Sequence, residues 1–197
     1  MSIKSKIKKL VFGPKIGNTK YQNFWWNLYN FSLEGMNIGE GSGFTESGEK
    51  AALDFLVKNV ISSKTPILFD VGANIGGYTL ELLAYFKNAE IHCFEPAAET
   101  YKSLCKNITD SRVICNNLGI SDSISESTLY YDCENSGMAS LYNRQLDYFG
   151  IDFSKSETVS LDTLDHYCEK NSISNIDFLK MDIEGNELNA LHGAKKC

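Results

Sequence analysis

The sequence predicts an α/β fold with a doubly wound, mostly parallel sheet. Short apolar runs of strand length alternate along the chain with longer segments whose apolar residues recur at helical spacing. A Gly-rich turn follows the first of these runs, and polar side chains follow the ends of later ones, as in sheets that bind a ligand at their carboxyl edge. With 197 residues, the chain can form one such domain and a small appendage.

The first 48 residues differ in composition from the rest and are predicted to form an N-terminal appendage to a domain at residues 49–197. Residues 3–11 place apolar side chains at helical spacing among lysines, which predicts a short basic amphipathic helix. An aromatic cluster at residues 24–31 and a Gly-rich run at residues 35–43 follow it.

The domain itself is predicted to begin with a helix that Ser47 caps. The parallel sheet is expected to contain strands at residues 67–71, 91–94, 113–115 and 176–181, with helices around residues 82–86 and 101–108 between the first three. Two further strands are predicted at residues 128–131 and 158–161, and a later helix at residues 161–168. The polar loop between the two strands, residues 132–157, is expected to line the substrate site together with residues 1–48. The two further strands are expected to pair with each other.

The formal net charge of −6 is distributed unevenly. Residues 1–20 carry six lysines and no acid, whereas the other 177 residues share 13 basic and 25 acidic side chains, a balance of −12. An acidic body with only two arginines argues against a nucleic-acid partner, since phosphate contacts need clustered Lys and Arg. The basic tip raises a separate hypothesis, peripheral contact of residues 1–20 with a membrane surface, because lysine-rich helices favour anionic lipid.

No apolar run approaches ~18 residues, and no secretory signal is recognisable, so the chain is expected to be cytoplasmic. The six cysteines form no C-x-x-C pair and lack histidines at metal-binding spacing, so we predict reduced, buried thiols and no metal. The three histidines are expected at polar surface positions: His92, His166 and His192.

The strongest functional signal is the turn after the first predicted strand. Gly72 and Gly76 let the backbone turn tightly and let a ligand approach closely, with Asn74 between them. The helix that follows offers free N–H groups at its N-terminus. The spacing meets the dinucleotide fingerprint G-x-G-x-x-G only in part, and Asp70 would repel a pyrophosphate but suit a ligand with an ammonium group.

Acidic residues follow the ends of two other predicted strands. Glu95 comes about 20 residues after the glycines, where a carboxylate binds the ribose hydroxyls of a nucleoside. Asp182 and Glu184 follow the last strand and would share one face if the chain stays extended there. They could orient a substrate hydroxyl, accept its proton or hold a divalent ion. Alternatively, Glu184 and Glu187 only enrich the first turn of a helix, where acids are favourable.

These segments resemble the FkbM-type family of S-adenosylmethionine-dependent methyltransferases. The matching segments are residues 69–76, 94–96, 117–122 and 180–185, with weaker matches at residues 36–49 and 159–165. The resemblance implies a class I methyltransferase with a Rossmann-like sheet and S-adenosylmethionine as cofactor. Members of the family mostly methylate oxygen, often on sugars of glycans or on natural products, so a small-molecule or glycan acceptor is expected.

The resemblance also implies roles for the candidate residues. Asp70 and residues 72–76 would hold the methionine part of the cofactor, and Glu95 would bind its ribose. Asn117 and Leu118 would flank the adenine. The implied place of Asp182 is beside the sulfonium methyl group and the acceptor, with Glu184 as the second catalytic candidate.

The chain departs from the family pattern in one feature. In family members the sheet commonly continues with three further strands after the helix that contains Leu188 and Leu191 in this chain, whereas this sequence ends at Cys197. We therefore expect the last strand to lie at a sheet edge, or to find its neighbours in another copy of the chain as a homo-oligomer. Two alternative functions stay open. One is a non-catalytic or incomplete module that binds a nucleoside-type cofactor, and the other is a nicotinamide-dependent oxidoreductase.

Overall fold

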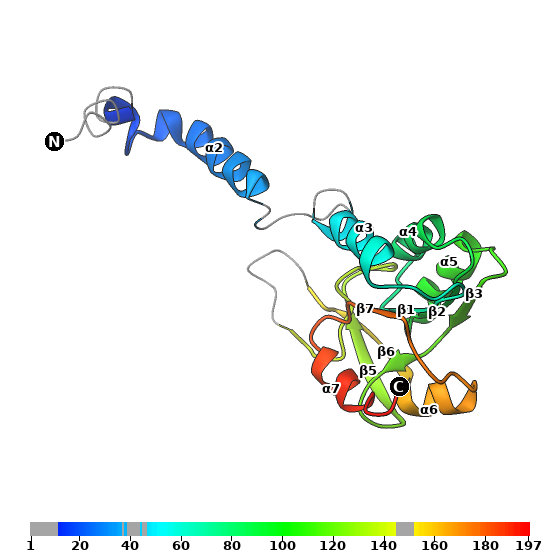
Figure 1. Cartoon of the computed structure of the whole chain (residues 1–197). Coiled ribbons are helices and arrows are strands. Elements are labelled where there is room, and N and C mark those ends of the chain that lie inside the picture. The colour runs from blue at the N-terminus through cyan, green and yellow to red at the C-terminus, as the bar shows by residue number, and fades with distance from the viewer. Residues whose placement is uncertain (1–11, 37, 39–43, 45–46, 145–151) are drawn as a thin grey trace. The chain divides into compact units, whose positions relative to one another are not determined.

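The fold was obtained as a computed structural model, shown in Figure 1. The structure describes residues 12–36, 38, 44, 47–144 and 152–197. The basic helix predicted at residues 3–11 and most of the Gly-rich run lie outside the described residues. No helix in the described ranges is long and apolar enough to cross a membrane.

The chain divides into two compact units, residues 1–55 and 56–197. The boundary between these units falls inside helix α3 (Glu49–Asn59). The composition predicts a division seven residues earlier, between residues 48 and 49. Ser47 caps α3 as predicted, since its Oγ accepts a hydrogen bond of 3.3 Å from the Glu49 N–H.

The first unit contains the predicted aromatic cluster, which forms a helix. Two short 3-10 turns, η1 (Gly13–Lys15) and η2 (Thr19–Tyr21), lead into α2 (Gln22–Gly35). The indole N–H of Trp25 donates to the Lys15 carbonyl at 3.0 Å, and the Trp25 ring packs 5.4 Å from the ring of Phe12. These contacts hold the segment before α2 against the helix.

The second unit is built on a four-stranded parallel sheet with the order β3-β2-β1-β7. The strands are β1 (Ile67–Val71), β2 (Glu90–Phe94), β3 (Val113–Asn116) and β7 (Phe178–Met181). Figure 1 shows helices on both sides of this sheet: α4 (Gly77–Tyr85) and α5 (Ala98–Asn107) on one, α6 (Leu164–Lys170) and α7 (Glu187–His192) on the other. The predicted doubly wound, Rossmann-like fold is confirmed, and β7 lies at an edge of the sheet as expected.

The strand order creates a crevice at the carboxyl edge of the sheet. From β1 the chain proceeds to β2 and β3 on one side, whereas β7 pairs with the other side of β1. Val71 at the end of β1 is in register with Phe94 on β2 and with Met181 on β7, so the three strands end together. Parallel sheets bind their ligands at such a change of direction.

A smaller sheet with the order β4-β6-β5 packs beside the first one (Figure 1). As predicted, β5 (Ser125–Tyr131) and β6 (Lys155–Asp162) pair antiparallel. The two-residue strand β4 (Gly119–Ile120) was not predicted, because it is too short to leave a pattern in the sequence. Leu161, which the prediction placed at the end of a strand and at the start of a helix, belongs to β6. Helix α6 starts only after Thr163, whose side chain accepts from the His166 N–H.

Aromatic side chains form the centre of the core between the main sheet and α6. Phe69 and Phe94 point to this face of the sheet, and the Tyr167 ring meets Phe94 edge-on at 4.7 Å. The edge-to-face contact is favourable beyond the area it buries. Buried residues from β1, β2, α6 and α7 thus share one hydrophobic cluster, which positions the strand ends on which the site is built.

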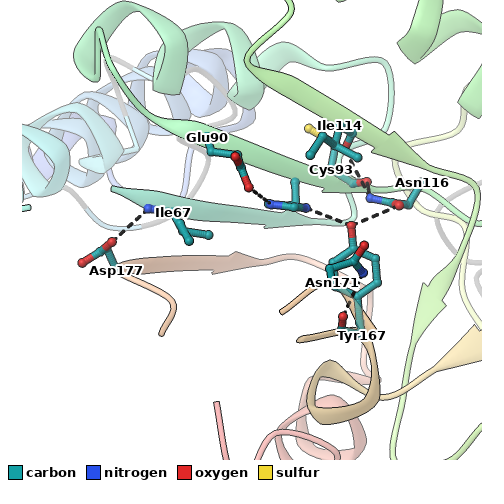
Figure 2. A network of polar contacts seen from close by, with 9 residues as sticks. Ile67, Glu90, Cys93, Ile114, Asn116, Tyr167, Asn171 and Asp177 are labelled. Carbon is teal, nitrogen blue, oxygen red and sulfur yellow. Dashed lines mark hydrogen bonds and ion pairs between the residues drawn. The ribbon is translucent and has the colours of Figure 1, made fainter. Parts of the chain in front are cut away.

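Figure 2 shows a polar network in this core, which includes Glu90, Asn116 and Tyr167. The burial of His92 in it contradicts the expected surface position of this histidine. His92 is 2% exposed; its Nε2 lies 2.9 Å from Glu90 Oε1 and its Nδ1 lies 2.8 Å from the Tyr167 hydroxyl. That hydroxyl also contacts Asn116, whose amide donates to the Cys93 carbonyl. The expectation failed because both faces of a central parallel strand are buried, so alternation of polar and apolar residues does not identify a solvent face.

We expect His92 to make folding stability depend on pH. Burial lowers the pKa of the His92 imidazole below its usual 6.5, although Glu90 opposes the shift. The unfolded chain therefore binds the proton more readily, so His92 stabilises fully above that value and its contribution is lost as the pH falls through the lower, folded pKa. Urea unfolding should show a free energy of unfolding that falls more steeply on acidification in the wild type than in His92→Gln, by at most about 1.4 kcal/mol per pH unit. Equal slopes would contradict this assignment.

Candidate active site

A cavity of about 290 Å³ opens where β1, β2 and β7 end. Its volume is at the lower end of the range for small-molecule sites. Six of the predicted site residues line it: Gly72, Asn74, Glu95, Leu118, Asp182 and Glu184. Three others do not: Asp70, Gly76 and Asn117. Residues 136, 137 and 139–141, which belong to the loop that we expect to line the substrate site, form part of the cavity wall.

Gly72 is required by the meeting of β1 with the end of β7. Its φ of +77° is a left-handed conformation, and a Cβ atom at this position would overlap the backbone carbonyl of Asp182. The amide N–H of Gly72 donates to the Phe94 carbonyl at 3.0 Å, which ties the turn to β2 as well. Gly76, with φ +93°, packs against Leu104 and Ile108 and serves the turn rather than the cavity.

Asn74 and Glu95 are joined directly. The backbone N–H of Asn74 donates to Glu95 Oε2 at 3.0 Å, and the Ala97 N–H donates to Oε1 at 2.9 Å. Glu95 is only 6% exposed, and burial raises the pKa of its carboxyl to about 7, with Glu157 adding to the shift and Lys180 opposing it. Each carboxylate oxygen keeps acceptor capacity for a further hydrogen bond at the cavity wall.

Asp70 lies behind the cavity rather than in it. The side chain is fully buried; Oδ2 accepts a 2.7 Å hydrogen bond from the Thr79 hydroxyl, and Oδ1 lies 3.2 Å from Lys180 Nζ. Lys180 does line the cavity and also donates to the Gly72 carbonyl at 3.0 Å. Sequence reasoning assigned Lys180 no role, although the pairing of β1 with β7 places it beside Asp70.

Asn117 supports the cavity from outside. Its amide donates to the carbonyls of Glu95 and Pro96 at 2.9 and 2.8 Å, which fixes the turn after β2. The next residue, Leu118, is part of the cavity wall. The two residues that follow β3 thus have different roles: Leu118 is an apolar residue of the cavity wall, and Asn117 holds the backbone of the turn after β2.

Asp182 and Glu184 do not share one face, because β7 ends at Met181 and the chain then turns. Asp182 is exposed at the cavity, and its carboxylate has no hydrogen bond or ion pair with the described part of the chain. Glu184 is half-buried, adopts φ +53° and forms a 2.8 Å ion pair with Arg144. Glu187 accepts hydrogen bonds from the N–H groups of Ile183 and Gly185, so it stabilises the start of α7 as the alternative interpretation proposed.

A segment after β5, residues 136–144, crosses from the glycine turn to the loop before α7. At one end the Asn74 amide donates to the Ser136 carbonyl at 3.0 Å. At the other, the Ser140 hydroxyl donates to the Glu184 carbonyl at 2.9 Å and the Arg144 guanidinium pairs with the Glu184 carboxylate. We call this segment the strap. Its individual contacts left no recognisable signal in the sequence.

The described ranges contain no group of three or more His, Cys, Asp or Glu side chains arranged to hold a metal ion. All six cysteines lie in the described ranges, and all six are free thiols. Three of them are exposed, contrary to the prediction of buried thiols: Cys105, Cys133 and Cys197.

A family model described as the methyltransferase FkbM domain matches residues 70–196, which is more than half of the chain. The chain belongs to the FkbM methyltransferase family. The match contains every residue that lines the cavity, from Val71 to Asn186. The FkbM domain is therefore a methyltransferase domain, and its strand ends form the candidate active site.

Other comparisons add little to the family match. A solved structure that resembles the chain is coclaurine N-methyltransferase bound to N-methylheliamine and SAH, with 17% identity and a TM-score of 0.30. The likeness covers 41% of this chain and 25% of that protein, too little to support conclusions about this FkbM domain. No match was found among curated proteins.

Two glycines of the FkbM domain give a matched test of the geometry. Gly72→Ala should lower the free energy of unfolding by at least about 2 kcal/mol, because a left-handed backbone and a backbone overlap both disfavour a Cβ. Gly77→Ala is the control, since nothing lies within 4 Å of a Cβ at the start of α4. It should be neutral or slightly stabilising. Chemical denaturation of both variants measures the difference, and equal stabilities would contradict the close approach of β1 and β7.

Proposed function

We propose that this chain is an S-adenosylmethionine-dependent O-methyltransferase that acts on a hydroxyl of a saccharide or of a related natural product. The family match supports methyl transfer. One observation supports a hydroxyl acceptor: the cavity contains a carboxylate, Asp182, that has no partner among the described residues. Such a group can accept a proton from an incoming hydroxyl.

The cavity residues fit S-adenosylmethionine. Glu95 offers two carboxylate oxygens with spare acceptor capacity, which suits the two hydroxyls of a ribose. Leu118 offers an apolar contact for the adenine, and residues 72–75 of the turn line the part of the cavity where the methionine part would lie. Asp70 would support that end of the site through Lys180, not by contact.

When bound, S-adenosylmethionine supplies an electrophilic methyl group on a sulfonium centre. The protein's share is to hold the acceptor in line with that group and to keep both at reacting distance. Asp182 would orient the acceptor hydroxyl and take its proton. Because Glu184 is paired with Arg144, we assign it a positioning role at the cavity rim and leave Asp182 as the catalytic base.

The family match decides against the nicotinamide-dependent oxidoreductase. The sequence argument that Asp70 would repel a pyrophosphate does not exclude this enzyme class, because the carboxylate is buried beside Lys180 and does not line the cavity. The non-catalytic module remains as the outcome in which the cofactor binds but no acceptor is methylated.

Isothermal titration with S-adenosylhomocysteine tests the cofactor site. Hydroxyl donors favour the ionised carboxyl of Glu95, whose pKa in the free protein is raised to about 7. Affinity should therefore fall roughly tenfold from about pH 8 to about pH 6, as the carboxyl takes up its proton. Glu95→Gln should bind roughly tenfold more weakly at the higher pH and lose this pH dependence. Glu99→Gln, an exposed charge on α5, is the control and should match the wild type.

Asp182→Asn tests the catalytic base. Release of S-adenosylhomocysteine in the presence of free sugars and glycosides should fall by roughly 100- to 10,000-fold relative to the wild type. Cofactor affinity should stay within about twofold, because the substitution keeps the size of the side chain and removes only its charge. Asp122→Asn, exposed and outside the cavity, should have wild-type activity. Unchanged turnover in Asp182→Asn would exclude its role as base.

A further inference from the structure

The first unit carries a large exposed aromatic surface that the methyltransferase site does not use. On α2, Phe31 is 71% exposed and Trp26 is 58% exposed. Further exposed apolar side chains on the same helix are Phe24, Leu28 and Tyr29. Single exposed apolar residues are ordinary, but a helix with five of them marks an interaction surface.

The sequence of α2 divides this helix into two unequal faces. Phe24, Leu28 and Phe31 recur at positions i, i+4 and i+7 on one flank of the helix. Trp26 and Tyr29, whose rings lie 5.8 Å apart, are on the opposite flank, and Trp25 is on the side between the two. The polar side chains instead lie on one narrow stripe, which consists of Asn23, Asn27, Asn30 and Glu34. The helix is therefore amphipathic, with a broad apolar side.

Positive charge precedes this helix in the sequence. The chain has six lysines and no acid before Glu34, its first carboxylate. Lys15 Nζ lies 5.6 Å from the centre of the Phe24 ring, and its carbonyl accepts from the Trp25 indole. The described segment before α2, which carries Lys15 and Lys20, and the aromatic helix thus belong to one small body.

We propose that this body binds the surface of a membrane that contains anionic lipid, with the apolar side of α2 lying in the interface. Tryptophan and tyrosine are favoured at the level of the lipid headgroups, and each nearby lysine is attracted by anionic headgroups. A second copy of the chain fits this surface less well, because both partners would bring the same positive charge to the contact. The site is independent of the proposed methyl transfer.

The tryptophans provide the measurement. The chain has two, Trp25 and Trp26, and both lie on α2, so the intrinsic fluorescence of the full chain reports on this helix alone. Mixing with phosphatidylcholine vesicles that contain phosphatidylserine should shift the emission to shorter wavelength and carry the protein into the vesicle pellet. Added salt should weaken both effects, because it screens the lysines from the headgroups.

Matched variants separate the two parts of the surface. Phe31→Asn removes one apolar contact and should weaken binding roughly tenfold, whereas Asn27→Ser on the polar stripe should leave it within about twofold. Replacing Lys15 and Lys20 by Gln should lower binding to vesicles with phosphatidylserine roughly tenfold. Circular dichroism of each variant checks that its helix content is unchanged.

Three results would overturn the proposal. The first is an unchanged emission spectrum, with the protein left in the supernatant. The second is equal binding to vesicles with and without phosphatidylserine at every salt concentration. The third is emission at short wavelength before any lipid is added, which means that the aromatic side is already covered. Sedimentation velocity then tells whether a second copy or the same chain covers it.

Discussion

The close approach of the glycine turn after β1 to the backbone after β7 is the constraint on which the site depends. Gly72 touches the Asp182 carbonyl, and the Asp182 N–H donates to the Val71 carbonyl at 3.0 Å. This contact fixes where Asp182 stands relative to the turn that bounds the cavity. The aromatic core below the sheet keeps both strand ends in register, so packing and site geometry have one common origin.

An ion pair between Asp70 on β1 and Lys180 on β7 also stabilises the contact between these two strands. Asp70 is fully buried, and a carboxylate there requires a counter-charge, which Lys180 supplies from the neighbouring strand. Because Lys180 also donates to the Gly72 carbonyl, the ion pair orients the turn itself. Three of the carboxyl groups at or behind the cavity thus differ in environment. Asp70 is buried and paired with Lys180, Glu95 is buried with a raised pKa, and Asp182 is exposed at the cavity.

The sequence predicted the strands and the glycine turn well, because buried parallel strands and a left-handed turn leave strong local patterns. It failed where position depends on the rest of the fold. His92 alternates with apolar residues, yet α6 covers that face of β2, and Asp70 belongs to a motif, yet its side chain points to α4. The ion pair between Arg144 and Glu184 joins residues 40 positions apart and follows no period, so no local pattern in the sequence predicts it.

The strap contacts two residues of the cavity whose backbones are strained. Asn74 and Glu184 are non-glycine residues with positive φ, a conformation that costs about 1–2 kcal/mol per residue and persists only where the surroundings enforce it. The strap contacts both: Ser136 accepts from Asn74, while Ser140 and Arg144 hold Glu184. The cavity rim is therefore shaped by a segment without regular secondary structure. Substitutions in the strap can therefore change the shape of the cavity rim, while the part of the cavity that is built on strand ends stays fixed.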